Sequence, residues 1–174
     1  KKALGDDGLL RSILATLEDE GFRIVGADTL LGSVLATPGT IGVHTPDEQA
    51  QRDIERGAEV LTALSRVDVG QAAVIQEGLV LGVEAIEGTD ALLARCHALR
   101  RDGLGGVLVK IRKSGQDDRV DLPTIGVETI RAAARAGLRG VAIEAGGTMI
   151  MERDEVVREA DEQGLFVIAI EIAK

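Results

Sequence analysis

The sequence predicts an α/β fold, in which helices flank a mixed, mostly parallel sheet that contains one β-hairpin. The first observation behind this prediction is that short apolar runs alternate with amphipathic helical segments along most of the chain. The second is the stretch QAAVIQEGLVLGVEA, where only Glu77 and Gly78 separate two strand-like runs. So short a connection is typical of a tight hairpin, which makes at least one strand pair antiparallel.

Composition narrows the classes of function. The chain has 174 residues, of which 45% are hydrophobic, enough to bury a core and to argue against disorder. Two Phe are its only aromatic residues and its formal net charge is -9, so we expect no nucleic-acid partner. A single cysteine, Cys96, excludes an internal disulfide framework and a cysteine-rich zinc site. No apolar run approaches the roughly 18 residues of a membrane span, so we expect a cytoplasmic protein.

The first part of the chain predicts a helix over residues 6–22, which Gly21 ends, and then a short buried strand over 22–27. A second short helix is expected over 28–39, and a Pro- and Gly-rich linker follows it. One short strand between two helices cannot form its own core. We therefore expect residues 1–45 to be the C-terminal part of an N-terminal domain plus the linker.

Residues 46–174 predict a second domain, which begins with a long helix from about Asp47 to Arg66. The hairpin comes next. The elements expected after it are a helix over 87–103, a strand over 105–113, a helix over 126–137, a strand over 139–145, a turn or short strand over 146–151, a helix over 152–164 and a strand over 165–172.

The stretch KIRKSGQDDRVDLPTIG concentrates opposed charges where a buried strand ends. Lysine and arginine at such an end can hold phosphate oxygens, and carboxylates beside them can carry a divalent metal or orient a water molecule. The alternative is a solvated loop of paired surface charges. Pro123 stiffens the end of the stretch, Thr124 offers a hydroxyl group, and the following helix can present backbone N–H groups to an anion.

Two further places carry chemistry. Glu84 interrupts an apolar strand, so its carboxylate should have a partner, either a basic side chain or a metal. Thr89 or Asp90 is expected to cap the next helix, and capping alone would explain that motif. Glu144 ends a buried strand before Gly146-Gly147, where a ligand could approach the backbone, although a plain tight turn is the alternative.

Other site classes find no support in the sequence. It contains no dinucleotide-binding or P-loop signature. His44 and His97 share no metal-ligand spacing, so both are expected to be structural or surface residues.

Three stretches together resemble a known family: QEGLVLGVEAIEGTDALLAR, GGVLVKIRKSGQDDRVDLPTIG and GVAIEAGGTMIMERDEVVREAD. They are similar to the UDP-2,3-diacylglucosamine pyrophosphatases of lipid A biosynthesis, of the alphaproteobacterial type rather than the metallophosphoesterase type. The resemblance covers about Asp6 to Glu171. Members of that family have an N-terminal domain before the catalytic one, which implies that this chain is N-terminally incomplete and that 46–174 is the catalytic domain.

The resemblance implies hydrolysis of UDP-2,3-diacylglucosamine to UMP and 2,3-diacylglucosamine 1-phosphate (lipid X). Water would attack the sugar-side phosphorus with the help of Mg²⁺ or another divalent cation. Motifs and resemblance together give Asp121 as the catalytic residue. The expected substrate-binding residues are Lys110, Lys113, Gln116, Arg119, Thr124, Thr89 and Gly147, and the expected metal ligands are Asp121, Asp117 and Glu84.

A lipid substrate implies contact with the membrane surface, so the resemblance places a cytoplasmic enzyme peripherally at the inner membrane. The expected partners are UDP-2,3-diacylglucosamine, lipid X and a second copy of the chain in a homodimer. The alternative function is a non-catalytic module that binds a nucleotide-sugar or phospholipid ligand. A third alternative is a structural α/β domain that pairs with another subunit.

Overall fold

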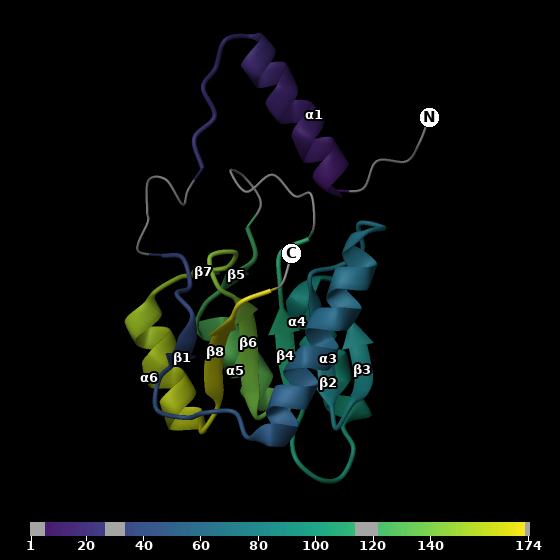
Figure 1. The fold of residues 1–174 in the computed structure, drawn as a ribbon, viewed down its shortest axis with the longest axis vertical. Coiled ribbons are helices and arrows are strands. Elements are labelled where there is room, and N and C mark those ends of the chain that lie inside the picture. Colours follow the sequence, from purple (N-terminus) through teal and green to yellow (C-terminus); the bar gives the residue numbers. More distant parts are fainter. Residues whose placement is uncertain (1–5, 27–33, 114–121, 173–174) are drawn as a thin grey trace.

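The computed structural model describes residues 6–26, 34–113 and 122–172 and contains a six-stranded sheet with the order β1-β8-β6-β4-β2-β3 (Figure 1). The strands of this sheet are β1 (Gly39–Ile41), β2 (Ala72–Gln76), β3 (Leu79–Val83), β4 (Val107–Lys110), β6 (Gly140–Glu144) and β8 (Phe166–Ile170). The helices are α1 (Asp6–Asp19), α3 (Glu48–Ser65), α4 (Gly88–Leu99), α5 (Val127–Arg135) and α6 (Arg153–Gln163). The predicted α/β fold is confirmed.

The sheet is mixed, as predicted. Strands β4, β6 and β8 lie parallel to one another, whereas β2 is antiparallel to both β3 and β4, and β1 is antiparallel to β8. Strands β3, β4, β6 and β8 therefore point the same way. Their C-terminal ends meet at one edge of the sheet, which we call the carboxyl edge.

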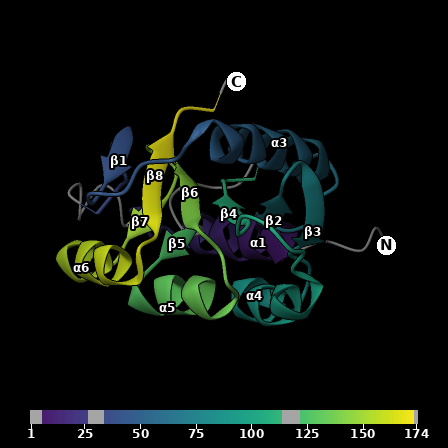
Figure 2. The ribbon, with the colours of Figure 1, turned by 90° about the horizontal axis from the view of Figure 1, so that it is seen from below.

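Helices cover the sheet unequally. Figure 2 shows α3 on one face and α4, α5 and α6 on the other. The core on the α3 side includes Ile54, Leu61 and Val109, and the core on the opposite side includes Leu92, Ile130 and Val167. Strands β2, β4 and β6 are buried at every residue because they pack on both faces, which explains why they read as continuous apolar runs.

The β2–β3 hairpin is confirmed, and its turn has a clear stereochemical basis. Glu77 and Gly78 both have positive φ, 51° and 81°, as a type I′ hairpin turn requires. The Asp53 side chain of α3 is 1% exposed and accepts hydrogen bonds from the backbone N–H groups of Glu77 (3.0 Å) and Gly78 (2.7 Å). Thus α3 fixes the turn at the edge opposite the carboxyl edge.

The N-terminal part differs from the prediction. The strand expected over 22–27 is absent from its described residues 22–26, where the Phe22 side chain is 63% exposed and forms no part of a core. The helix expected over 28–39 does not include its described residues 34–39. Residues 39–41, predicted as linker, instead form β1 and pair with β8. The domain boundary after residue 45 stays a prediction.

Two short strands were not predicted as a pair. Strands β5 (Thr124–Ile125) and β7 (Met149–Ile150) form a separate two-stranded parallel sheet, and Leu35 bridges to Met149. This small sheet joins the two loops that leave the carboxyl edge. Thr124 is thereby placed in a strand just before α5, where the sequence predicted only a loop leading into a helix.

Candidate active site

Lys110 is the last residue of β4 and lies at the centre of the carboxyl edge. The residue is 7% exposed. Its ammonium group donates hydrogen bonds to the Thr89 hydroxyl oxygen (3.1 Å) and to the Thr124 carbonyl oxygen (2.9 Å). The predicted site residues Lys110, Thr89 and Thr124, which come from three different elements, therefore lie together. The Lys110 ammonium group is located at the C-terminal end of β4, where ligands bind in open α/β sheets.

Glu84 has the protein partners that its buried position requires. It is 6% exposed, and its carboxylate accepts hydrogen bonds from the Thr89 hydroxyl group (3.0 Å) and from the Gln71 backbone N–H (3.1 Å). The prediction that Thr89 or Asp90 caps the helix was wrong, because the N-cap of α4 is Glu87, which makes no side-chain capping bond. The Thr89 hydroxyl group instead donates its hydrogen bond to the buried Glu84 carboxylate.

Arg112 and Glu144 form a second pairing at this edge. The Glu144 carboxylate, at the end of β6, accepts hydrogen bonds from the Arg112 backbone N–H (2.8 Å) and guanidinium group (3.1 Å). Gly147 leaves room for this carboxylate, because a Cβ atom there would come within 2.9 Å of Glu144 Oε1. In the structure, the missing side chain of Gly147 therefore leaves the space that the Glu144 carboxylate needs.

Lys113 reaches to a residue that the motifs did not single out. Its ammonium group lies 2.7 Å from Asp68 Oδ1, and Asp68 follows α3 in a left-handed conformation (φ 56°). Gln71 was also missed. A sequence signal near both residues is Gly70, which lies between them and adopts a positive φ of 59° in the structure.

The remaining predicted site residues lie outside the described part of the chain. These are Gln116, Asp117, Arg119 and Asp121. Of the three expected metal ligands, only Glu84 is described, and protein N–H and O–H groups bind both of its oxygens. Across residues 6–26, 34–113 and 122–172, no three histidine, cysteine or acidic side chains gather as a metal site would require.

Two buried side-chain oxygens near this edge lack a hydrogen-bond partner in the described structure. They are Gln71 Oε1 and Thr148 Oγ1, and Thr148 is fully buried. Buried polar atoms are usually hydrogen-bonded, so each is an acceptor that a water molecule or a ligand could satisfy.

An ion pair lies at the C-terminal end of the edge strand β3. Arg95 pairs with Glu87 at 2.9 Å and donates a hydrogen bond to the Val83 carbonyl oxygen. The backbone N–H of Glu87 itself and then the Arg95 guanidinium group hold the pKa of the Glu87 carboxyl below its ordinary value. The lowered pKa favours the carboxylate form of Glu87, which is the form that pairs with Arg95.

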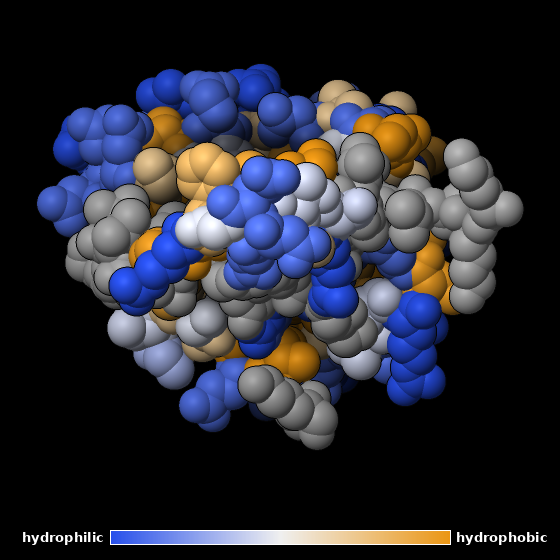
Figure 3. All heavy atoms as spheres, turned by 90° about the horizontal axis from the view of Figure 1, so that it is seen from above, coloured by the Kyte–Doolittle hydropathy of each residue, from blue (hydrophilic) through white to orange (hydrophobic). Residues whose placement is uncertain are grey.

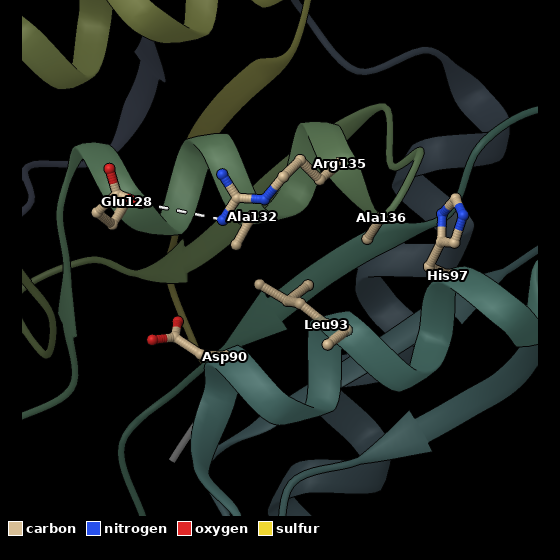
Figure 4. A pocket seen from close by; sticks show the side chains of 8 residues that line it. Asp90, Leu93, His97, Glu128, Ala132, Arg135 and Ala136 are labelled. Carbon is tan, nitrogen blue, oxygen red and sulfur yellow. Dashed lines mark ion pairs between the residues drawn. The ribbon is translucent and has the colours of Figure 1, made fainter.

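A cavity of about 340 Å³ lies between α4 and α5 (Figure 4). Asp90 and Glu128 line it near the start of each helix, and His97 and Arg135 line it near the ends. Arg135 lies 3.9 Å from Glu128. The interpretation of His97 as a structural or surface residue stays a prediction.

The surface toward which β4, β6 and β8 run is chemically mixed. In the view from above, hydrophobic residues are dispersed among hydrophilic ones (Figure 3). Within the described part of the chain, no helix is both long enough and apolar enough to cross a bilayer.

Residues 37–168 match a family model described as the LpxI C-terminal domain. Over 173 residues the chain is 46% identical to the UDP-2,3-diacylglucosamine pyrophosphatase LpxI of Caulobacter vibrioides. The alignment covers 96% of this chain and 62% of that relative, so the chain spans less than two thirds of the relative's length.

Proposed function

The chain belongs to the LpxI C-terminal domain family, and on this premise we propose that it hydrolyses the diphosphate bond of UDP-2,3-diacylglucosamine. The products would be UMP and 2,3-diacylglucosamine 1-phosphate. The observation that carries the proposal is the 46% identity to a protein named for that pyrophosphatase activity. The cluster of Lys110, Arg112 and Lys113 at the carboxyl edge supports it, because a diphosphate needs such cations.

The proposed reaction is a displacement at the phosphorus nearer the sugar. The oxygen of water bonds to that phosphorus and the water gives up a proton to the solvent, while the bridging P–O bond breaks and its electron pair leaves with UMP. The ammonium group of Lys110 would stabilise the charge that develops on the phosphate oxygens, because it is buried and held in place before the substrate arrives. Asp121 would orient the attacking water.

A divalent cation, Mg²⁺ or a similar ion, is part of this proposal. It would neutralise charge on the diphosphate. The described residues do not form a site for it by themselves, and two of the expected ligands, Asp117 and Asp121, lie outside them. No step above therefore depends on a particular metal ligand.

The decisive experiment measures UMP release from UDP-2,3-diacylglucosamine by the full-length protein, with Mg²⁺ and with EDTA. We expect Mg²⁺-dependent release, and we expect Asp121→Ala to abolish turnover while retaining the fold. Ligand binding without any UMP release would favour the alternative of a non-catalytic module. An unchanged rate in Asp121→Ala would remove that residue from the mechanism.

Contact with the membrane and self-association belong to the same proposal. Because the proposed substrate carries two acyl chains, we propose that a cytoplasmic protein meets it at the inner-membrane surface without spanning the bilayer. Sedimentation with phospholipid vesicles tests this, and recovery of all protein in the supernatant would contradict it. Light scattering tests the proposed homodimer through the molar mass in solution.

A further inference from the structure

A continuous chain of hydrogen bonds crosses the carboxyl edge from β2 to β5. The Gln71 N–H and the Thr89 hydroxyl group donate to Glu84, at 3.1 and 3.0 Å. The Lys110 ammonium group then donates to the oxygen of that same Thr89 hydroxyl group and to the Thr124 carbonyl oxygen, at 3.1 and 2.9 Å. Glu84 and Lys110 are 6% and 7% exposed, so water contributes little to either group.

The direction of these bonds matches a carboxylate at position 84. A carboxylate only accepts hydrogen bonds, so it can take both the Gln71 N–H and the Thr89 O–H. Once the hydroxyl proton points to Glu84, the lone pairs of the hydroxyl oxygen are available to Lys110. A glutamine side chain has only one accepting side-chain oxygen, which the Gln71 N–H would need. Its NH₂ group would then face the Thr89 hydroxyl group, which would have to turn its proton away from position 84 and accept from the NH₂ group and from Lys110 at once.

The same arrangement lowers the cost of burying an ammonium ion. An isolated buried charge is expensive unless it is paired and hydrogen-bonded. Thr89 links the negative carboxylate to the positive ammonium group, so the Glu84–Thr89–Lys110 unit contains opposite charges joined by directed bonds. Such a network holds its members in one geometry more firmly than separate bonds would.

We propose that Glu84 is a positioning residue, which acts through Thr89 to hold the Lys110 ammonium group in its place for a substrate phosphate. This rests on the proposed function, in which Lys110 contacts phosphate. It gives Glu84 a role different from the metal ligand that the sequence predicted.

The first test is Glu84→Gln in the full-length protein. We expect kcat for UMP release to fall by about 10- to 100-fold, with KM changing less, because the loss affects charge stabilisation during the reaction. The Mg²⁺ concentration for half-maximal activity should stay unchanged. An increase in that concentration, or an unchanged kcat, would overturn the proposal in favour of metal ligation or of no role.

The second test removes the hydroxyl link. Thr89→Val should lower kcat as much as Glu84→Gln does, and Thr89→Ser should restore it. Because both changes break one chain, the double variant should be no worse than either single variant. If the loss of kcat in the double variant equals the product of the two single losses, Glu84 and Thr89 do not act through one chain of hydrogen bonds.

A matched control distinguishes this role from general instability. Asp53 is an equally buried carboxylate that accepts backbone N–H groups, but it lies at the opposite edge of the sheet. Asp53→Asn should lower the melting temperature and leave kcat unchanged when it is assayed well below that temperature. A comparable loss of kcat in Asp53→Asn would show that the removal of any buried carboxylate lowers activity. That result would contradict the proposal.

A readout without turnover separates the two proposals. The ¹⁵N signal of the Lys110 ammonium group, assigned with Lys110→Met, should be visible in the wild type because burial and hydrogen bonds slow its proton exchange. It should disappear in Glu84→Gln and Thr89→Val and persist in Asp53→Asn. Persistence in Glu84→Gln would overturn the positioning role even in a protein that hydrolyses the substrate. Conversely, a wild-type protein that shows this pattern but releases no UMP would refute only the proposed function.

Discussion

The pairing of Arg112 with Glu144 depends on a residue that has no side chain. A Cβ atom on Gly147 would stand 2.7 Å from Glu144 Cδ, so the carboxylate would have to turn away. The carboxylate cannot turn without losing its hydrogen bonds to the backbone and side chain of Arg112. The loss of such bonds by a buried carboxylate lowers the free energy of unfolding.

Two neighbouring glycines allow a controlled test of this dependence. Gly147→Ala should destabilise the protein by about 1–3 kcal/mol and lower kcat, because it displaces Glu144 and with it Arg112. Gly146→Ala meets no atom within 4 Å but imposes a left-handed φ of 67° on alanine. It should cost about 1–2 kcal/mol of stability and leave kcat unchanged. Thermal unfolding and UMP release measure both effects, and equal kcat values for the two variants would refute the role of Gly147.

Sequence reasoning located individual residues better than their partners. Lys110, Lys113 and Thr124 stood out because charges and a hydroxyl group at a strand end are unusual in an apolar context. The partners of these residues are far away in the sequence, since Arg112 meets Glu144 across 32 positions and Lys113 meets Asp68 across 45. No local pattern encodes such contacts, because they follow from the order of strands in the sheet.

Among the elements, α3 packs unusually closely on the sheet. Gly57 in the middle of this helix faces β4, and a Cβ atom there would lie 2.5 Å from Val109 Cγ2 and 3.2 Å from Ile75 Cγ1. Both of those side chains are fully buried and cannot move into solvent. The backbone of α3 therefore sets the height of the helix above the sheet.

Helix propensity and packing make opposite predictions for this position. Alanine is the better helix former by about 1 kcal/mol. We nevertheless expect Gly57→Ala to destabilise the protein by a net of about 1–3 kcal/mol, because the added methyl group overpacks the core. Denaturant unfolding measures this, and Val109→Ala in the same protein should recover part of the loss. Stabilisation by Gly57→Ala would show that α3 can lift away from the sheet freely.

The predicted elements were correct where the periodicity extended over many residues. Helices α3 to α6 have such patterns, and the buried strands β2, β4 and β6 were recognisable as continuous apolar runs. The errors fall on short segments: β1 has three residues and β5 has two. The two-residue strand β7 lies within the turn or short strand predicted over 146–151, but its pairing with β5 was not predicted. Strands of this length are specified by their neighbours rather than by their own residues. Residues 22–26, with Phe22, Ile24 and Val25, looked like a strand but have no strand beside them.

At the scale of the whole molecule, charge is distributed unevenly. The chain has a net charge of -9, yet Lys110, Arg112 and Lys113 follow one another closely where β4 leaves the sheet. An acidic surface around a local group of cations repels polyanions in general, while it still admits a small anionic ligand to that group.

The position of β1 determines how far the chain can be shortened from its N-terminal side. It covers the outer edge of β8, whose residues Phe166–Ile170 are all apolar and would otherwise present unpaired backbone groups to solvent. A protein that begins at residue 46, the predicted domain boundary, would keep every helix from α3 onward but expose this strand. We expect it to form aggregates that bind thioflavin, whereas a protein that begins at residue 34 should stay monodisperse. If both proteins stay monodisperse, β1 is not needed to protect β8, and the domain can be shortened to residue 46.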